Sequence, residues 1–227
     1  MSEVAENTKA PREPLFSKKN RKLVTDPLTD NNPVTIQVLG ICSALAITVQ
    51  VKQAVVMGLS VFFVLVLGNL IISWLRNLIP SRIRIIVQLV VVASLVIIVN
   101  ETLKAFLPDV SEQLSVFVGL IITNCIIMGR FEAFAMGNKA WPSVMDGVGN
   151  SLGYAGLLIL VAFFRELFGS GTLWGVPIFG DYIKGDGLYS MGYMNNNMMI
   201  LPPMALIIVG VVIWVQRARN KSLIEEH

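Results

Sequence analysis

The sequence has few of the residues that soluble enzymes use for chemistry. Its 227 residues include two cysteines and one histidine, and only 15% are charged. Two thiols and the imidazole of His227, at the end of the chain, cannot complete a four-ligand site made of cysteine and histidine. With a hydrophobic content of 54%, the chain also cannot bury its apolar surface in a soluble core. The composition therefore excludes a soluble catalytic domain.

The chain consists largely of long apolar runs. Its mean hydropathy is +0.68, and the charged residues gather at the ends and between these runs. This arrangement predicts an all-α integral membrane protein with short loops. We expect a cytoplasmic N-terminal tail at residues 1–33, a six-helix membrane domain at 34–216 and a cytoplasmic C-terminal tail at 217–227. The six predicted spans cover residues 34–49, 53–74, 85–107, 114–128, 150–168 and 198–215.

The first and fourth predicted spans are short or broken. The first, at residues 34–49, reaches roughly 24 Å at 1.5 Å per residue, against a hydrocarbon core of about 30 Å. The fourth contains Thr123, Asn124 and Cys125 side by side, where a plain membrane helix would have apolar residues. Cys42 lies in the first span, so each of these two spans holds one of the two cysteines. We expect any chemistry of the chain at these two places.

The positions of the cysteines predict an internal repeat. Because they fall in the first and fourth spans, a repeat unit contains three helices. An odd number of helices forces the second copy to enter the membrane from the opposite side. The second helix of each half ends in an Arg-x-Leu triplet, at Arg76–Leu78 and Arg165–Leu167, followed by Pro80 or Gly169. We therefore expect six transmembrane helices arranged as two inverted three-helix repeats.

The distribution of basic residues predicts the orientation in the membrane. Cytoplasmic loops carry an excess of lysine and arginine. With both termini inside, the outer loops hold only Lys52, Lys104 and Lys184. The inner side then holds Lys9, Arg12, Lys18, Lys19, Arg21, Lys22, Arg76, Arg82, Arg84, Arg130, Lys139, Arg217, Arg219 and Lys221. Both termini are therefore predicted to be cytoplasmic.

The two cysteines have three interpretations. Cysteine is a small, soft apolar residue, so both could serve helix packing alone. A disulfide between Cys42 and Cys125 is disfavoured, because the pair would lie at membrane depth away from the oxidising face. Metal ligation is the third interpretation, since thiolates select iron, iron–sulfur clusters, zinc or copper. Two thiolates are half of such a site, so a metal centre here would need two cysteines from another subunit.

The residues around both cysteines also resemble a known family. The chain is similar to the D-subunit family of the bacterial Na+-translocating NADH:quinone oxidoreductases, from about residue 31 to residue 173. The segments that carry this resemblance are Asn31–Pro33, Gln37–Ala46, Leu114–Arg130 and Phe163–Leu167. The resemblance implies a multi-pass subunit of a ubiquinone-reducing translocase in the bacterial inner membrane. In that role the chain would not be catalytic alone.

The same resemblance implies a shared cofactor. Cys42 and Cys125 would contribute to an iron centre, a 2Fe-2S cluster or a single iron, held jointly with the homologous E subunit in a pseudo-twofold heterodimer. The centre would relay electrons between redox carriers of other subunits, coupled to Na+ export. The A, B, C and F subunits and membrane lipid are the further partners implied, with flavins and NADH bound only in other subunits. No nucleic-acid partner is expected.

Two alternatives remain open. The E subunit of an Rnf ferredoxin:NAD oxidoreductase shares the fold and the cysteines, but a proline is expected there just after the first cysteine, where this chain has Ser43. The other is a small inverted-repeat secondary transporter without a redox cofactor. A transporter would place ionisable residues at midplane depth. The first and fourth spans offer only uncharged polar residues: Gln37, Ser43, Thr123 and Asn124.

Several other polar or small residues are assigned structural roles. We expect Arg165 to reach the interface or to contact a partner subunit, because it lies near the outer end of the fifth predicted span. Glu132 and Asp146 bracket an inner loop, where we expect them to be solvated. Four glycines could suggest a phosphate loop, but no strand precedes them. Close helix packing explains their spacing better, at Gly147, Gly149, Gly153 and Gly156.

Overall fold

The computed structural model describes residues 18–28, 31–80, 82–106, 119–174, 176–177 and 197–219. Parts of several predicted regions lie outside these ranges. They are most of both tails (1–17 and 220–227, with His227), the start of the fourth span (114–118) and the loop at 178–196 with Lys184.

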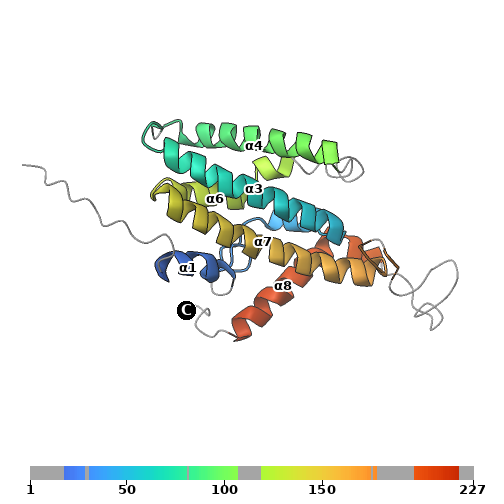
Figure 1. The fold of residues 1–227 in the computed structure, drawn as a ribbon. Coiled ribbons are helices and arrows are strands. Elements are labelled where there is room, and N and C mark those ends of the chain that lie inside the picture. Colours follow the sequence, from blue (N-terminus) through green and yellow to red (C-terminus); the bar gives the residue numbers. More distant parts are fainter. Residues whose placement is uncertain are drawn as a thin grey trace, which may run out of the picture.

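The described chain is almost wholly helical (Figure 1). A helix satisfies its own backbone N–H and C=O groups, which a bilayer core requires. Two very short strands form an antiparallel pair after α7. In chain order the elements are α1 (Lys18–Thr25), the 3-10 turn η1 (Asp26–Leu28), α2 (Ile41–Ile47), α3 (Val51–Leu75), α4 (Arg84–Phe106), α6 (Cys125–Arg130), the π-helical turn η2 (Phe131–Ala135), α7 (Ala140–Gly169), β1 (Thr172–Leu173), β2 (Val176–Pro177), η4 (Asn197–Ile200) and α8 (Pro202–Arg219).

The two longest helices, α3 and α7, form the centre of the fold (Figure 1). They run antiparallel, because Gly58 early in α3 meets Ala155 in the middle of α7. Asn69, near the end of α3, donates a 2.9 Å hydrogen bond to the carbonyl of Ser143, near the start of α7. A Cβ on Gly58 would lie 2.9 Å from Ala155 Cβ. A glycine at this crossing therefore lets the two backbones approach closely.

Four helices of the described residues are long and apolar enough to cross a membrane, namely α3, α4, α7 and α8. The first two correspond closely to the predicted second and third spans, and α8 to the sixth. α8 begins at Pro202, as expected of a proline in an opening turn, where its missing N–H has no helical acceptor. α4 packs against α3, and α8 diverges from α7 in Figure 1.

The first and fourth predicted spans are not long helices in the described residues. α2 has 7 residues and is preceded by turns from residue 33 to residue 40. The fourth run is helical at residues 119–122, is interrupted at Thr123 and Asn124, and resumes as the 6-residue α6. Within the described residues, the expected shortness of the first segment and the expected break in the fourth are confirmed.

The fifth predicted span starts ten residues too late. The helix begins at Ala140 instead of Asn150 and has 30 residues. Pro142 does not prevent this, because the first-turn N–H groups of a helix have no intrahelical acceptor. Asp146 does not prevent it either, since the carboxylate is paired with Arg130. Sequence hydropathy excluded these first turns because it counts a paired charge as an exposed one.

The N-terminal segment packs onto the glycines of α7. The carbonyl of Leu23 in α1 would lie 2.6 Å from a Cβ on Gly149, and that of Pro27 in η1 2.6 Å from a Cβ on Gly153. Backbone therefore rests on backbone, which only glycine permits at this distance. The expected packing role is confirmed for Gly147, Gly149 and Gly153, but it is wrong for Gly156, where a Cβ would meet nothing within 4 Å. The glycine spacing could not show that α1 and η1 would be the segments that pack on Gly149 and Gly153.

Candidate metal centre

Cys42 lies in the first turn of α2, and its side chain is exposed. The helix begins after Gly40, whose φ of 80° is a left-handed conformation that glycine adopts without a Cβ penalty. A Cβ here would lie 3.0 Å from Tyr154 Cε2 and 3.3 Å from Asn124 Oδ1. The backbone just before Cys42 therefore rests directly on two side chains from later parts of the chain.

Cys125 is the first residue of α6, and its side chain is also exposed. Asn124, the residue before it, has an extended backbone, and its Oδ1 accepts a 3.3 Å hydrogen bond from Ile126 N. This side chain caps the new helix by satisfying one of its unpaired N–H groups. The helix break thus places Cys125 at the start of a helix instead of within a continuous one.

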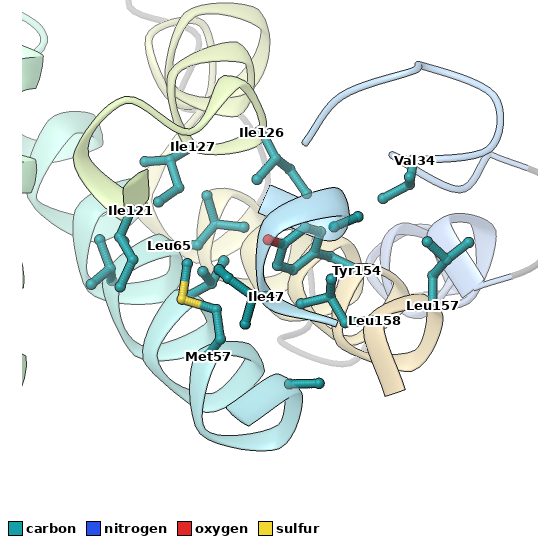
Figure 2. Packing of buried hydrophobic residues seen from close by; sticks show 14 of the residues in the cluster. Val34, Ile47, Met57, Leu65, Ile121, Ile126, Ile127, Tyr154, Leu157 and Leu158 are labelled. Atoms are coloured by element: carbon teal, nitrogen blue, oxygen red, sulfur yellow. The ribbon is translucent and has the colours of Figure 1, made fainter. Parts of the chain in front are cut away.

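A polar bridge of three side chains, Ser43, Asn124 and Tyr154, joins the surroundings of the two cysteines. The oxygen atoms of Ser43 and Tyr154 lie 2.6 Å apart, and Asn124 Nδ2 donates to them at 3.4 and 3.3 Å. All three residues are fully buried, and Figure 2 shows Tyr154 within the apolar cluster. Ser43 directly follows Cys42, and Asn124 directly precedes Cys125. The bridge therefore holds the starts of α2 and α6 beside each other.

Arg165 of α7 holds the other end of α2. Its side chain is only 1% exposed. The guanidinium donates to Leu45 O at 3.3 Å, to Thr48 Oγ1 at 2.7 Å and to Met199 O at 3.1 Å, and also to Ile200 O. The expected contact of Arg165 with the interface or with a partner subunit is wrong. The last turn of α2 and the turn η4 supply buried acceptors within the chain itself.

Glu166, the next residue, fixes the start of α3. Its Oε2 accepts a 2.6 Å hydrogen bond from Val51 N, the first helical residue. Gln50 precedes that residue and makes no capping bond through its own side chain. A carboxylate from α7 therefore takes the place of a local N-cap. Because Arg165 and Glu166 bind successive segments, α7 fixes the turn that connects α2 to α3.

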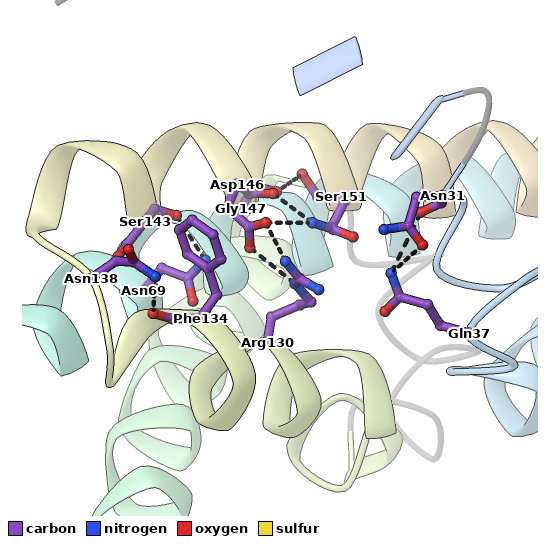
Figure 3. A network of polar contacts seen from close by, with 11 residues as sticks. Asn31, Gln37, Asn69, Arg130, Phe134, Asn138, Ser143, Asp146, Gly147 and Ser151 are labelled. Carbon is purple, nitrogen blue, oxygen red and sulfur yellow. Dashed lines mark hydrogen bonds and ion pairs between the residues drawn. The ribbon is translucent and has the colours of Figure 1, made fainter. Parts of the chain in front are cut away.

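A second polar network lies where α6 meets the first turns of α7 (Figure 3). Arg130 Nε donates to Asp146 Oδ2 at 2.9 Å, and the other guanidinium contact completes a two-point ion pair. Asn150 donates to the same carboxylate at 3.1 Å. Asp146 is 1% exposed, so its expected solvation is wrong. Glu132, by contrast, is exposed as expected and pairs with Arg84 of α4.

The geometry leaves the chain with two available thiols. Both cysteines are free, so they form no disulfide with each other, as expected. Their exposure also argues against a role in packing within this chain. Across the described ranges, no group of three or more His, Cys, Asp or Glu side chains is placed to hold a metal ion. Two thiols fit an iron–sulfur centre as half of its ligand set, and a second chain would have to supply the rest.

The comparison with known proteins decides the family. The family described as "Rnf-Nqr subunit, membrane protein" matches residues 20–213. The chain belongs to the Rnf-Nqr family. Among its relatives there, the D subunit of the Na+-translocating NADH-quinone reductase of Photobacterium profundum is 51% identical over 209 residues, covering 92% of this chain and 97% of that protein. The corresponding D subunit of Psychromonas ingrahamii is likewise 51% identical, over the same shares of the two chains.

The Rnf-Nqr match includes parts of the chain that the sequence resemblance left aside. It begins at residue 20, so it takes in most of α1 and all of η1. It ends at residue 213, within α8. Most of the N-terminal segment that packs on the α7 glycines and the first two thirds of α8 therefore belong to the family's common region.

Tyr154, the centre of the polar bridge, was not among the residues predicted for the site. A signal was available, because a buried tyrosine hydroxyl generally needs a hydrogen-bond partner. Tyr154 lies in the apolar part of a predicted span, so its hydroxyl had to find that partner inside the protein. What the sequence could not show is that the partners would be the neighbours of the two cysteines.

Proposed function

We propose that this chain is the D subunit of a Na+-translocating NADH-quinone reductase, and that Cys42 and Cys125 form half of an iron–sulfur centre shared with the homologous E subunit. The observation that supports this most strongly is the placement of the two thiols. Both are exposed, and the residues next to them are joined through Tyr154. Two thiols held in this way, without a third ligand among the described residues, suit a centre completed by a second chain.

The order of the elements supports an inverted repeat and a homologous partner. A short cysteine-bearing helix, a long central helix and a further long helix follow one another twice, as α2, α3, α4 and as α6, α7, α8. The central helices α3 and α7 are antiparallel, as the second members of two inverted repeats would be. The segments around α2 and α6 would complete the first and fourth of six spans. A related subunit meeting this one across a pseudo-twofold axis would then bring four cysteines together.

The chain's own contribution would be to supply two metal ligands and to exclude water from the centre. An iron–sulfur centre bound at the cysteines would supply one-electron transfer between carriers of neighbouring subunits. Cys42 and Cys125 would ligate it, with the buried apolar cluster beneath them shielding it from solvent. The A, B, C and F subunits would hold the flavins and the NADH and quinone chemistry. Na+ export would be a property of the whole complex, and this chain would contain no catalytic residue.

The arrangement of basic residues supports an inner-membrane protein with both termini in the cytoplasm. The antiparallel pairing of α3 and α7 brings Arg76 and Lys139 to one end of the bundle. Arg84 is at this end as well, because it pairs with Glu132, just before α7. Lys52 lies at the opposite end, where α3 begins. This bias matches the positive-inside rule.

The test is to replace each ligand in the intact complex. Cys42→Ser and Cys125→Ser should each remove iron and acid-labile sulfide from one centre and abolish its electron paramagnetic resonance signal. Ser94→Ala, at an exposed position of α4, is a control that should leave both unchanged. Normal iron content and electron transfer in either cysteine variant would overturn the proposal. A wild-type complex without this iron would instead favour a transporter without a redox cofactor.

A further inference from the structure

The neighbouring acceptors indicate which way the hydrogen bonds of the polar bridge run. Ser43 donates its only hydroxyl proton to Gly40 O at 2.8 Å. Either oxygen of the 2.6 Å contact between Ser43 and Tyr154 could donate, and with the Ser43 proton on Gly40 O the donor is Tyr154. Asn124 donates its amide protons toward both hydroxyl oxygens, while its own Oδ1 accepts from Ile126 N. A chain of directed hydrogen bonds thus runs from the capping residue of α6 to the first turn of α2.

Tyr154 is the one member of this bridge that lies outside the two cysteine segments. It belongs to α7, which packs extensively against α3. Its ring contacts the backbone at Gly40, and its hydroxyl contacts Ser43 and Asn124. Both short helices therefore use the same tyrosine as their point of attachment. Neither is long enough to be stable in isolation, so its position depends on such contacts.

We propose that Tyr154 is the positioning residue that sets the separation and orientation of Cys42 and Cys125. Its hydroxyl bonds to the residue after one cysteine and accepts from the residue before the other. Without this hydroxyl, only the 3.4 Å hydrogen bond from Asn124 to Ser43 still joins the two helix starts within the bridge, so they can shift relative to each other. The inference rests on the proposed function only for its chemical consequence, which is a change in the properties of the shared iron–sulfur centre.

Tyr154→Phe is the sharpest test, because the ring still fills its place while the bridging hydroxyl is lost. Ser43→Ala removes the oxygen to which the Tyr154 hydroxyl bonds. It provides a second test if the Tyr154→Phe variant fails to assemble. Ser151→Ala is the matched control. Ser151 is also buried on α7, but its hydroxyl bonds only to carbonyls of its own helix, those of Gly147 and Val148.

Two measurements separate this inference from the proposed function. In membranes containing the full chain without its partner subunit, thiol-reactive cross-linkers of graded length report the spacing of the two cysteines. In the purified complex, redox titration followed by electron paramagnetic resonance gives the midpoint potential and g values of the centre. Tyr154→Phe and Ser43→Ala, the two bridge variants, should each react with a broader range of cross-linker lengths than the wild type. Both should also shift the midpoint potential of the centre. The Ser151 variant should match the wild type in both.

Each remaining outcome is decisive. Wild-type cross-linking and wild-type potential in both bridge variants would overturn the positioning role and leave the proposed function intact. A wild-type complex that lacks the centre would overturn the proposed function. The cross-linking profile would then still decide whether Tyr154 positions the two thiols.

Discussion

Arg165 donates a 2.7 Å hydrogen bond to the hydroxyl of Thr48, the C-cap residue of α2, although the two lie 117 positions apart in the sequence. The guanidinium also binds carbonyls of α2 and η4. We expect Arg165→Met to destabilise the protein, because each buried acceptor left unpaired costs about 1–3 kcal/mol. Thermal unfolding of the purified complex measures this. Arg217→Met, at an exposed site on α8, should change little, and equal effects of the two substitutions would contradict the assignment.

Glu166 acts as a cap for a helix other than its own. Loss of a helix cap costs about 0.5–2 kcal/mol, so Glu166→Ala should lower stability by that order. Glu166→Gln retains an oxygen that can accept from Val51 N and should have the smaller effect. The order of the two unfolding temperatures is the measurement. A glutamine variant as unstable as the alanine variant would show that charge, and not capping, is the important property.

The pairing of Arg130 with Asp146 predicts a non-additive response. Removing one partner of a buried ion pair leaves an uncompensated charge and costs about 3–5 kcal/mol. Arg130→Met and Asp146→Leu should each destabilise strongly, whereas the double variant should recover much of the loss, since apolar replacements of both partners are often neutral. A double-mutant cycle on unfolding temperature tests this. Simple additivity would mean that the pair is not coupled.

Two glycines in long helices should respond in opposite ways to alanine. A Cβ on Gly68 would overlap with Phe131 Cζ, whereas a Cβ on Gly156 would meet nothing within 4 Å. Overpacking a filled site costs about 1–3 kcal/mol, so Gly68→Ala should destabilise. Gly156→Ala should be neutral or stabilising by up to about 1 kcal/mol, because alanine favours the helix. Stability measurements that fail to separate the two variants would refute the packing described for Phe131.

Hydropathy predicted the long helices well, because a span is a local property of the sequence. α3 and α4 begin and end within two residues of their predicted limits. The break before Cys125 was also predictable, since Thr123 and Asn124 interrupt an apolar run. The start of α7 was not, because it depends on a charge pair between residues 16 positions apart, Arg130 and Asp146.

The candidate site likewise has parts that could be predicted from the sequence and parts that could not. The two cysteines stood out by their scarcity, and ligand counting showed that they could form only half of a site. Their support did not stand out, because Tyr154 and Arg165 act on α2 from more than a hundred positions away. Long-range contacts of this kind leave no periodic pattern in one sequence. Arg165 was therefore misassigned to the protein surface, although the position of its helix was predicted.

The dependence of α2 on α7 also has a consequence for biosynthesis. Cys42 leaves the ribosome long before Tyr154 and Arg165, which lie 111 and 117 positions beyond the α2 residues that they bind. The segment around Cys42 therefore enters the membrane without the contacts that later fix its place. Its final geometry is reached only after α7 has been inserted and has folded back against α3. Under the proposed function, metal delivery to the two thiols would thus belong to a late, post-translational stage of assembly.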